Sequence, residues 1–350
     1  MTQKPSLAGL GSIRPRTVTV DSELTVRRST LPGLAELPLL IEPERTGGDF
    51  AAWARGQRAT FDRELATAGG ILFRGFHIDG PEGFQRAVEA LGGEALEYKE
   101  RSSPRSEVSG RVYTSTDYPP DQPIFLHNEN SYAHRWPARI FFFCDIEPDE
   151  GGATPLADVR RVYDRIPEEM RRRFEERGIL YRRNFSDLVG LSWQTVFQTD
   201  SREEAEGYAT AAGYRIEWLA GDRLRTERRA PAVVRHPGTD EPIWFNHGTF
   251  FHLSTLPDAV REGLEALFPR EELPNHTYYG DGSEIEAETM AALRQAYRDE
   301  TISFPWRRGD LLMLDNMLVA HGREPFRGER RILTAMTEPI EAAELPETAP

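Results

Sequence analysis

Residues 125–132 read Phe-Leu-His-Asn-Glu-Asn-Ser-Tyr and lie just before an apolar run, Ile-Phe-Phe-Phe-Cys, at 140–144. In an extended strand, residues i and i+2 point to the same face, so His127 and Glu129 should project together. An imidazole and a carboxylate on one face supply two ligands of the 2-His-1-carboxylate facial triad, which binds Fe(II) and leaves coordination positions open. The pair alone is equally compatible with a surface histidine beside a solvated glutamate, so other parts of the chain must decide.

The composition is that of a folded, loop-rich protein. Hydrophobic residues make up 39% of the 350 positions, enough for a sizeable core. The 29 glycines and 25 prolines indicate many turns and favour a mainly β architecture. A net charge of −14 argues against nucleic acid or an anionic membrane as the main partner. Cys144 is the only cysteine, so neither an internal disulfide nor a cysteine-based zinc site can form.

Both ends of the chain are expected to lie outside the folded core. Residues 1–35 are polar and rich in Pro, Ser and Thr, which predicts a flexible or loosely docked arm. The acidic residues 341–350 predict a disordered tail. The N-terminus lacks the apolar segment of a secretory signal, and no apolar run approaches the roughly 20 residues of a membrane span. We therefore expect one domain over residues 36–340 in a soluble, cytoplasmic protein.

A second histidine follows an apolar strand near the C-terminal end. His321 lies in the stretch Asp-Asn-Met-Leu-Val-Ala-His-Gly-Arg at 315–323, which is 194 positions after His127. Together with Gly-Gly-Ala-Thr-Pro at 151–155, Trp-Phe-Asn at 244–246 and Arg-Arg-Ile at 330–332, the order of these motifs resembles the taurine dioxygenase (TauD/TfdA) family. Members of that family are Fe(II)/2-oxoglutarate-dependent dioxygenases. Within it, the resemblance is greatest to SyrP-like hydroxylases, which act on amino acids in nonribosomal peptide pathways.

The resemblance implies a set of cofactor-binding residues. His127, Glu129 and His321 would ligate Fe(II), while Thr154 and Arg331 would hold the distal carboxylate of 2-oxoglutarate. Arginine suits this task because its guanidinium recognises a carboxylate through two parallel hydrogen bonds. Arg330 is adjacent, and neighbouring residues of a strand face opposite sides, so only one of the two can reach the site. We expect Arg331, because it opens the last apolar strand.

The family also implies a fold and a reaction. The fold would be a double-stranded β-helix (jelly roll) with flanking helices and a helical insertion at about 160–300. Three protein ligands and bidentate 2-oxoglutarate leave one position on octahedral iron for O₂. Related halogenases replace the carboxylate ligand with a small residue to admit chloride, so Glu129 argues against halogenation. Hydroxylation is then the default outcome, with desaturation and epoxidation left open.

Substrate-binding residues are less constrained by the sequence. Asn130 and Tyr132 follow the ligands closely, and Asn246 ends a predicted strand, so these three are candidates for the pocket. Structural hydrogen bonding within loops explains them equally well. His247 and His252 are conceivable rival metal ligands, but residues five apart do not share a face of a strand.

Taurine itself is not expected as the substrate. Taurine dioxygenase carries its sulfonate-binding arginine four positions after the cofactor arginine, and this chain has Ala335 there. We expect hydroxylation of an unactivated C–H bond of an amino acid, free or tethered to a carrier protein, in natural-product (antibiotic) biosynthesis. The alternatives are an oxygenase for another small acid, a zinc hydrolase with the same ligands, and a non-catalytic metal-binding sensor.

Arginines are concentrated between residues 160 and 183, and Arg171–173 are consecutive. Because carrier proteins are acidic, this cluster is a candidate docking patch. Glutamates are interleaved with the arginines, however, so a solvated face of mixed charge is the other interpretation. Nothing in the sequence decides whether the protein forms a homo-oligomer.

Overall fold

The computed structural model describes residues 24–97, 107–109, 111–114, 118–186 and 189–345. Its largest element is an eight-stranded sheet of strand order β1-β2-β3-β16-β7-β19-β5-β4. Neighbouring strands pair antiparallel except β2 and β3, which are parallel. The strands are β1 (Val26–Thr30), β2 (Leu39–Pro43), β3 (Gly70–Phe73), β4 (Glu107–Ser109), β5 (Val112–Thr114), β7 (Arg135–Ile146), β16 (Leu311–Asp315) and β19 (Arg331–Glu341).

Both faces of this sheet are buried. Along the central strands, alternate side chains such as Phe143 and Leu333 pack beneath two helices, α1 (Phe50–Ala68) and α2 (Gly80–Gly92). Their neighbours Phe142 and Ile332 point to the opposite face and join the core that the rest of the chain covers. Burial on both faces explains why these strands are continuous apolar runs instead of alternating patterns.

The first helix begins and ends at residues whose types suit those positions. The side chain of Asp49 accepts a hydrogen bond of 3.1 Å from the backbone N–H of Ala52, which caps the helix start. Gly69 ends the helix with φ 74°, a left-handed conformation that glycine adopts without a steric penalty. This helix covers the sheet on the side away from His127.

A smaller layer lies over the other face of the large sheet. It consists of a three-stranded sheet of order β6-β17-β9 and a short β8–β18 ladder. These sheets do not close into a continuous barrel, and the protein is mixed helix and strand where the sequence predicted a mainly β fold. The strands are β6 (Ile124–His127), β8 (Glu150–Gly151), β9 (Leu156–Asp158), β17 (Val319–Arg323) and β18 (Phe326–Arg327).

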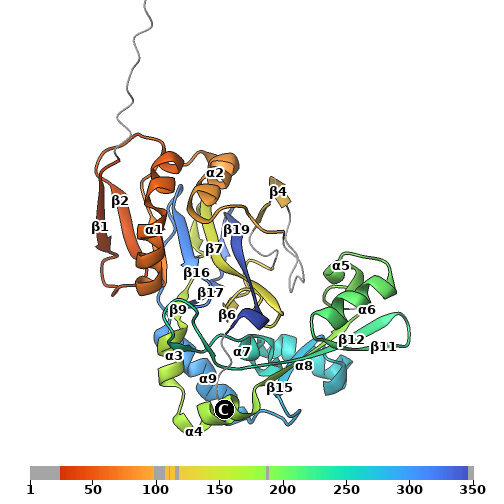
Figure 1. Ribbon diagram of the computed structural model, residues 1–350. Helices are drawn as coiled ribbons and strands as arrows, with labels where there is room; N and C mark the ends of the chain where they lie inside the picture. The colour runs from red at the N-terminus through yellow and green to blue at the C-terminus, as the bar shows by residue number, and fades with distance from the viewer. Residues whose placement is uncertain (1–23, 98–106, 110, 115–117, 187–188, 346–350) are drawn as a thin grey trace, which may run out of the picture.

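The segment between β9 and β16 contributes its own four-stranded sheet, of order β11-β12-β10-β15, and most of the helices. Figure 1 shows it below and to the right of the large sheet. The strands of this sheet are β10 (Ile179–Phe185), β11 (Arg215–Leu219), β12 (Arg223–Ala230) and β15 (Asn275–Tyr279). The segment also contains a separate two-stranded pair, β13 (Val234–Arg235) and β14 (Pro242–Ile243). Its helices are α3 (Val159–Arg165), α4 (Glu168–Arg177), α5 (Trp193–Phe197), α6 (Arg202–Ala211), α7 (Gly248–Phe251), α8 (Asp258–Leu267) and α9 (Ala287–Glu300), with 3-10 turns η1 (Leu253–Thr255) and η2 (Arg270–Glu272).

The chain ends are more ordered than the sequence suggested. Strand β1 lies within the expected arm, 1–35, and pairs with β2 along its whole length, so this part belongs to the large sheet. Strand β19 runs to Glu341 and a 3-10 turn, η3 (Ala342–Glu344), follows it, so the expected tail begins as regular structure. Residues 1–23 and 346–350 lie outside the described residues. No helix in the described ranges is long and apolar enough to cross a membrane.

Two buried histidines in the insertion stay neutral. The Nδ1 atom of His252 accepts the backbone N–H of Ser254 at 3.2 Å, and that of His276 accepts the N–H of Leu253 at 3.3 Å. Burial, helped by His276 and Arg294, lowers the pKa of His252 to about 3. Burial, helped by the cations Arg270 and Arg182, lowers the pKa of His276 to about 4.

These two histidines should make the fold sensitive to acid. In the unfolded chain they bind protons near pH 6.5, whereas in the folded protein they do so only near pH 3–4, so stability falls as the pH drops below 6.5. Between pH 7.5 and 5 we expect each to cost about 1–2 kcal/mol of the free energy of unfolding. Urea denaturation across this range measures the loss. A His252→Gln/His276→Gln variant should show a flatter pH dependence, and an unchanged slope would contradict the assignment.

Candidate metal centre

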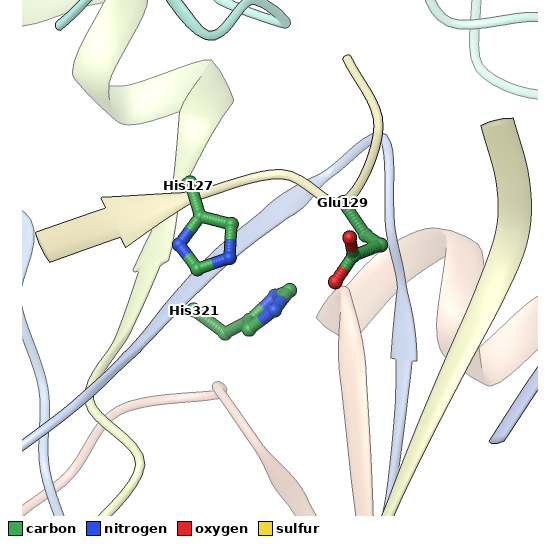
Figure 2. Close-up of side chains that lie close together, drawn as sticks. All are labelled: His127, Glu129 and His321. Atoms are coloured by element: carbon green, nitrogen blue, oxygen red, sulfur yellow. The ribbon is translucent and has the colours of Figure 1, made fainter. Parts of the chain in front are cut away.

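Two of the candidate ligands face each other across a pair of antiparallel strands. His127 ends β6, His321 lies in β17, and the two are direct partners in the register of these strands. Partners in a ladder project to the same face, so their rings converge. The ring centroids lie 4.6 Å apart at an angle of 51° (Figure 2). Strand pairing therefore brings together two residues that are 194 positions apart in the sequence.

Glu129 also lies beside the two histidines, but it is not part of a continued strand as the sequence predicted. Strand β6 ends at His127, and Glu129 lies in the turn that follows, as Figure 2 shows. The fully buried Asn316 holds this turn: its side chain accepts the N–H of Glu129 at 2.7 Å and donates to the Glu129 carbonyl at 3.0 Å. The same amide also donates to the carbonyl of Pro137 at 2.9 Å. The carboxylate position depends on this clamp and not on a continued strand.

The three side chains form a group that fits a divalent metal ion. One ligand atom from each of His127, Glu129 and His321 lies within 4.8 Å of the other two. The Nδ1 atom of His127 lies 2.9 Å from the carbonyl of Phe125, a contact that places the proton on Nδ1 and leaves the Nε2 lone pair for a metal. Two imidazoles and one carboxylate are the donor set that non-haem Fe(II) oxygenases use, and the set leaves other coordination positions open.

Comparisons with known proteins agree with this geometry. The family model described as taurine catabolism dioxygenase TauD, TfdA family matches residues 33–337. The chain belongs to the TauD/TfdA family. It is 40% identical over 279 residues to the dapdiamide synthesis protein DdaC of Enterobacter agglomerans, covering 80% of this chain and 85% of that protein. It is 32% identical over 297 residues to a clavaminate synthase-like protein of Arabidopsis thaliana, covering 82% and 87% respectively.

The fold is shared with solved oxygenases of the same kind. The structure of PvcB, an Fe, alpha-ketoglutarate-dependent oxygenase from an isonitrile synthetic pathway, superposes with a TM-score of 0.55 at 18% identity. The match covers 98% of this chain and all of that one. Membership of the TauD/TfdA family makes the protein an Fe(II)/2-oxoglutarate-dependent dioxygenase that uses Fe(II), 2-oxoglutarate and O₂. The resemblance to the TauD/TfdA family is thereby confirmed.

Thr154 lies close to the metal ligands, in a segment that runs beside β17. The backbone N–H groups of Gly322 and Glu324 donate to the carbonyls of Pro155 and Ala153, each at 3.0 Å, so Thr154 sits opposite the strand that carries His321. Its hydroxyl accepts a hydrogen bond of 3.1 Å from the indole N–H of Trp306 and is buried. This position leaves the hydroxyl proton available for an anion.

Arg331 does not face the site, contrary to the sequence interpretation. Its side chain is 48% exposed and its Nε donates to the carboxylate of Asp145. Ile332 points into the core on the triad's side of the sheet, and the strand register is irregular between it and Arg331. The sequence argument expected Arg331 on the inward face, and its side chain lies at the surface instead.

The adjacent Arg330 is the arginine turned inward. Its Nε donates to the carbonyl of Gly152 at 2.8 Å, two residues before Thr154, and its guanidinium lies 5.5 Å from the centre of the Phe326 ring. Burial, together with the nearby cation of Arg323, lowers the pKa of Arg330 to about 10. The side chain stays charged at neutral pH, and a bound anion would stabilise that charge because it is largely removed from water.

The predicted substrate residues have different surroundings. Asn130, with a left-handed φ of 56°, follows Glu129 in the chain and lines a pocket of about 410 Å³ whose lining includes none of the three metal ligands. Tyr132 is 1% exposed and packs against His247 and Phe251, so its ring is a wall of the centre. Asn246 is used structurally: its amide donates to one backbone carbonyl at 2.8 Å and accepts a backbone N–H at 2.9 Å. The structure therefore argues against Asn246 as a substrate ligand.

His247 lies next to the centre, although the spacing of His247 and His252 had argued against both as ligands. Its ring centroid is 5.4 Å from that of His127, and its Nδ1 lies 3.1 Å from the hydroxyl of Ser131. Burial, and then the neighbouring His127, lower the pKa of His247 well below its usual value. His252 lies outside the centre, against His276.

The arginine cluster of helix α4 is balanced by carboxylates. Arg171 and Arg172 lie 4.0 and 3.8 Å from glutamates one helical turn later, and Arg173 lies 2.7 Å from Glu169. The guanidinium of Arg171 also lies 4.3 Å from the centre of the Tyr163 ring. These pairs favour the interpretation as a solvated face of mixed charge.

The role of Asn316, which the sequence reasoning missed, can be measured. Asn316→Ala removes the three hydrogen bonds that hold the Glu129 turn, so we expect the affinity for Mn(II), used in place of Fe(II), to fall by about 10- to 100-fold. Asn184→Ala is the matched control, because it also removes amide bonds to backbone carbonyls but lies in the insertion. Titration of free Mn(II) by electron paramagnetic resonance gives both affinities, and equal values for the two variants would contradict the clamp.

Proposed function

We propose that this dioxygenase hydroxylates an unactivated C–H bond of an amino acid, free or tethered to a carrier protein, in natural-product biosynthesis. The observation that carries the proposal is the complete ligand set, with the Glu129 carboxylate within 4.8 Å of both imidazoles. A carboxylate in that position leaves no vacancy for chloride, so hydroxylation is favoured over halogenation. The 40% identity to a dapdiamide synthesis protein supports a biosynthetic role.

The residues divide the work at the centre. His127, Glu129 and His321 would hold Fe(II), which when bound supplies the activation of O₂. The carbonyl of Phe125 keeps His127 in the tautomer that can bind metal. Arg330 and Thr154 would bind the distal carboxylate of 2-oxoglutarate, since a guanidinium of intermediate exposure and a buried hydroxyl lie on neighbouring segments beside the ligands.

The pocket beside Asn130 supports an amino acid as the substrate. Its volume of about 410 Å³ suits a small molecule, and side chains of both charges line it. Arg111 and Arg135 can face a carboxylate, while Glu97 and Glu341 can face an ammonium group. A zwitterion would meet both signs of charge in such a lining, whereas the carboxylate of a simple acid would be attracted only by its arginines.

The proposal extends to the arrangement of the two sheets. We propose that the large sheet and the β6-β17-β9 sheet are the two halves of a double-stranded β-helix within one domain, with the segment between β9 and β16 as its insertion. The opposed burial of Phe142 and Phe143 on the two faces of β7 supports this arrangement.

The ligand assignment is tested by Fe(II)-dependent formation of succinate from 2-oxoglutarate with a panel of free and carrier-loaded amino acids. His127→Ala and Glu129→Ala should each abolish it, because two remaining ligands cannot hold the ion. His77→Ala, which changes an exposed histidine, is the control. Product mass should rise by one oxygen atom. Turnover that survives both ligand substitutions, or that proceeds without O₂, would eliminate the proposal.

The two adjacent arginines give a direct test of the cosubstrate site. Arg330→Gln should raise the KM for 2-oxoglutarate by about 10- to 100-fold, because a charge-assisted contact to the carboxylate is lost. Arg331→Gln should leave that KM within about threefold, since it removes only a half-exposed ion pair with Asp145. Initial rates at varied 2-oxoglutarate measure both. The reverse order would restore Arg331 as the cosubstrate ligand.

A further inference from the structure

A second cavity lies on the other side of the metal-binding turn. It has a volume of about 440 Å³ and is bounded by Ser131 and Trp136, the end of β12 at Arg228, Phe245, and the C-terminal residues Ala343 and Leu345. None of the three metal ligands, and neither Arg330 nor Thr154, lines it. The cavity is therefore distinct from the metal ligands and from the proposed cosubstrate site, and it shares only Trp136 with the pocket lined by Asn130.

The charge in this cavity belongs to Arg228. Its side chain is 8% exposed, and one guanidinium N–H donates to the carbonyl of Tyr132 at 3.1 Å. No carboxylate of the described residues forms an ion pair with it. Arg74, which is equally buried, instead contacts both oxygens of Asp310, at 2.9 and 2.6 Å. A buried guanidinium is costly without an anion, and Arg228 lines a space in which one can fit.

The other residues that line the cavity indicate what the uncharged part of the ligand is like. Ala133, Trp136, Val234 and Phe245 present apolar surface around the guanidinium. A ligand that fills this space should be compact and apolar, with its negative charge at the Arg228 end. A single guanidinium binds a carboxylate through two parallel hydrogen bonds, and the one negative charge of a carboxylate matches the one cation in the lining of this cavity.

We propose that this cavity is a binding site for an organic carboxylate with a small, branched apolar body. The proposal does not rest on the proposed function, because the cavity shares no residue with the cosubstrate site. The site adjoins the metal centre through one turn: Arg228 binds the carbonyl of Tyr132, and the hydroxyl of Ser131 donates to the carbonyl of Asn128 at 3.0 Å. A carboxylate bound to Arg228 would thus be linked through that arginine to the turn that carries Glu129.

Calorimetric titration of the full-length protein with 4-methylpentanoate tests the proposal. Saturation with Mn(II) and 2-oxoglutarate beforehand fills the cosubstrate site, so that the probe must bind elsewhere. The wild-type protein should bind the acid at least about tenfold more tightly than 4-methylpentanamide, which has the same body without the charge. Arg228→Gln should abolish this preference, whereas Arg228→Lys, which keeps the charge but loses the two-pronged geometry, should retain part of it.

Two further variants separate the cavity from general effects. Arg229→Gln changes the neighbouring, exposed arginine and should leave the affinity unchanged. Ala343→Phe fills the cavity from an exposed position, which spares the core, and should reduce binding by about tenfold or more. Equal affinity for acid and amide, or binding that persists in both Arg228→Gln and Ala343→Phe, would overturn the proposal. So would the absence of 4-methylpentanoate binding by the wild-type protein.

Discussion

The side-chain amide of Asn316 is the interaction on which the metal centre depends. Pairing of β6 with β17 places His127 opposite His321, but strand β6 ends there, and no ladder positions the carboxylate. Asn316 bonds both the N–H and the carbonyl of Glu129, and so replaces the missing ladder with a side chain. Because Asn316 directly follows β16 in the large sheet, the rigidity of that sheet is passed to the third ligand. The position of the third ligand is thus set by a side chain that is not itself a metal ligand.

Two arginines that are largely shielded from solvent, Arg330 and Arg228, are a second feature of the structure. Arg330 and Arg228 each donate to a backbone carbonyl, and we propose a carboxylate ligand for each: 2-oxoglutarate for Arg330 and the ligand of the second cavity for Arg228. The net charge of −14 means that the protein carries many more carboxylates than cations, so its composition does not limit ion pairing. Arg228 nevertheless forms no ion pair with a carboxylate of the described residues, and it lines the second cavity. In Arg74 the same residue type is fully paired and serves the fold alone.

The insertion contributes the walls of the centre while the large sheet contributes its framework. His247 from the insertion approaches the ring of His127, and Tyr132 packs against His247 and Phe251, which both belong to the insertion. Substrate choice within the family can therefore change through the insertion without disturbing the ligands, since the loops of a rigid scaffold carry specificity. Residues of the segment 130–136 line both pockets.

The sequence by itself determined the chemistry: the His-x-Glu pair, the distant His321 and the order of the motifs identified an Fe(II)/2-oxoglutarate dioxygenase. These features are readable because they depend on residue type and local spacing. Tertiary structure alone decided that Arg330 and not Arg331 turns inward, that Asn246 is consumed by backbone bonds, and that Arg228 faces a cavity. Each of these depends on strand register or on partners far away in the chain, and a shift of one residue in a strand reverses every side chain.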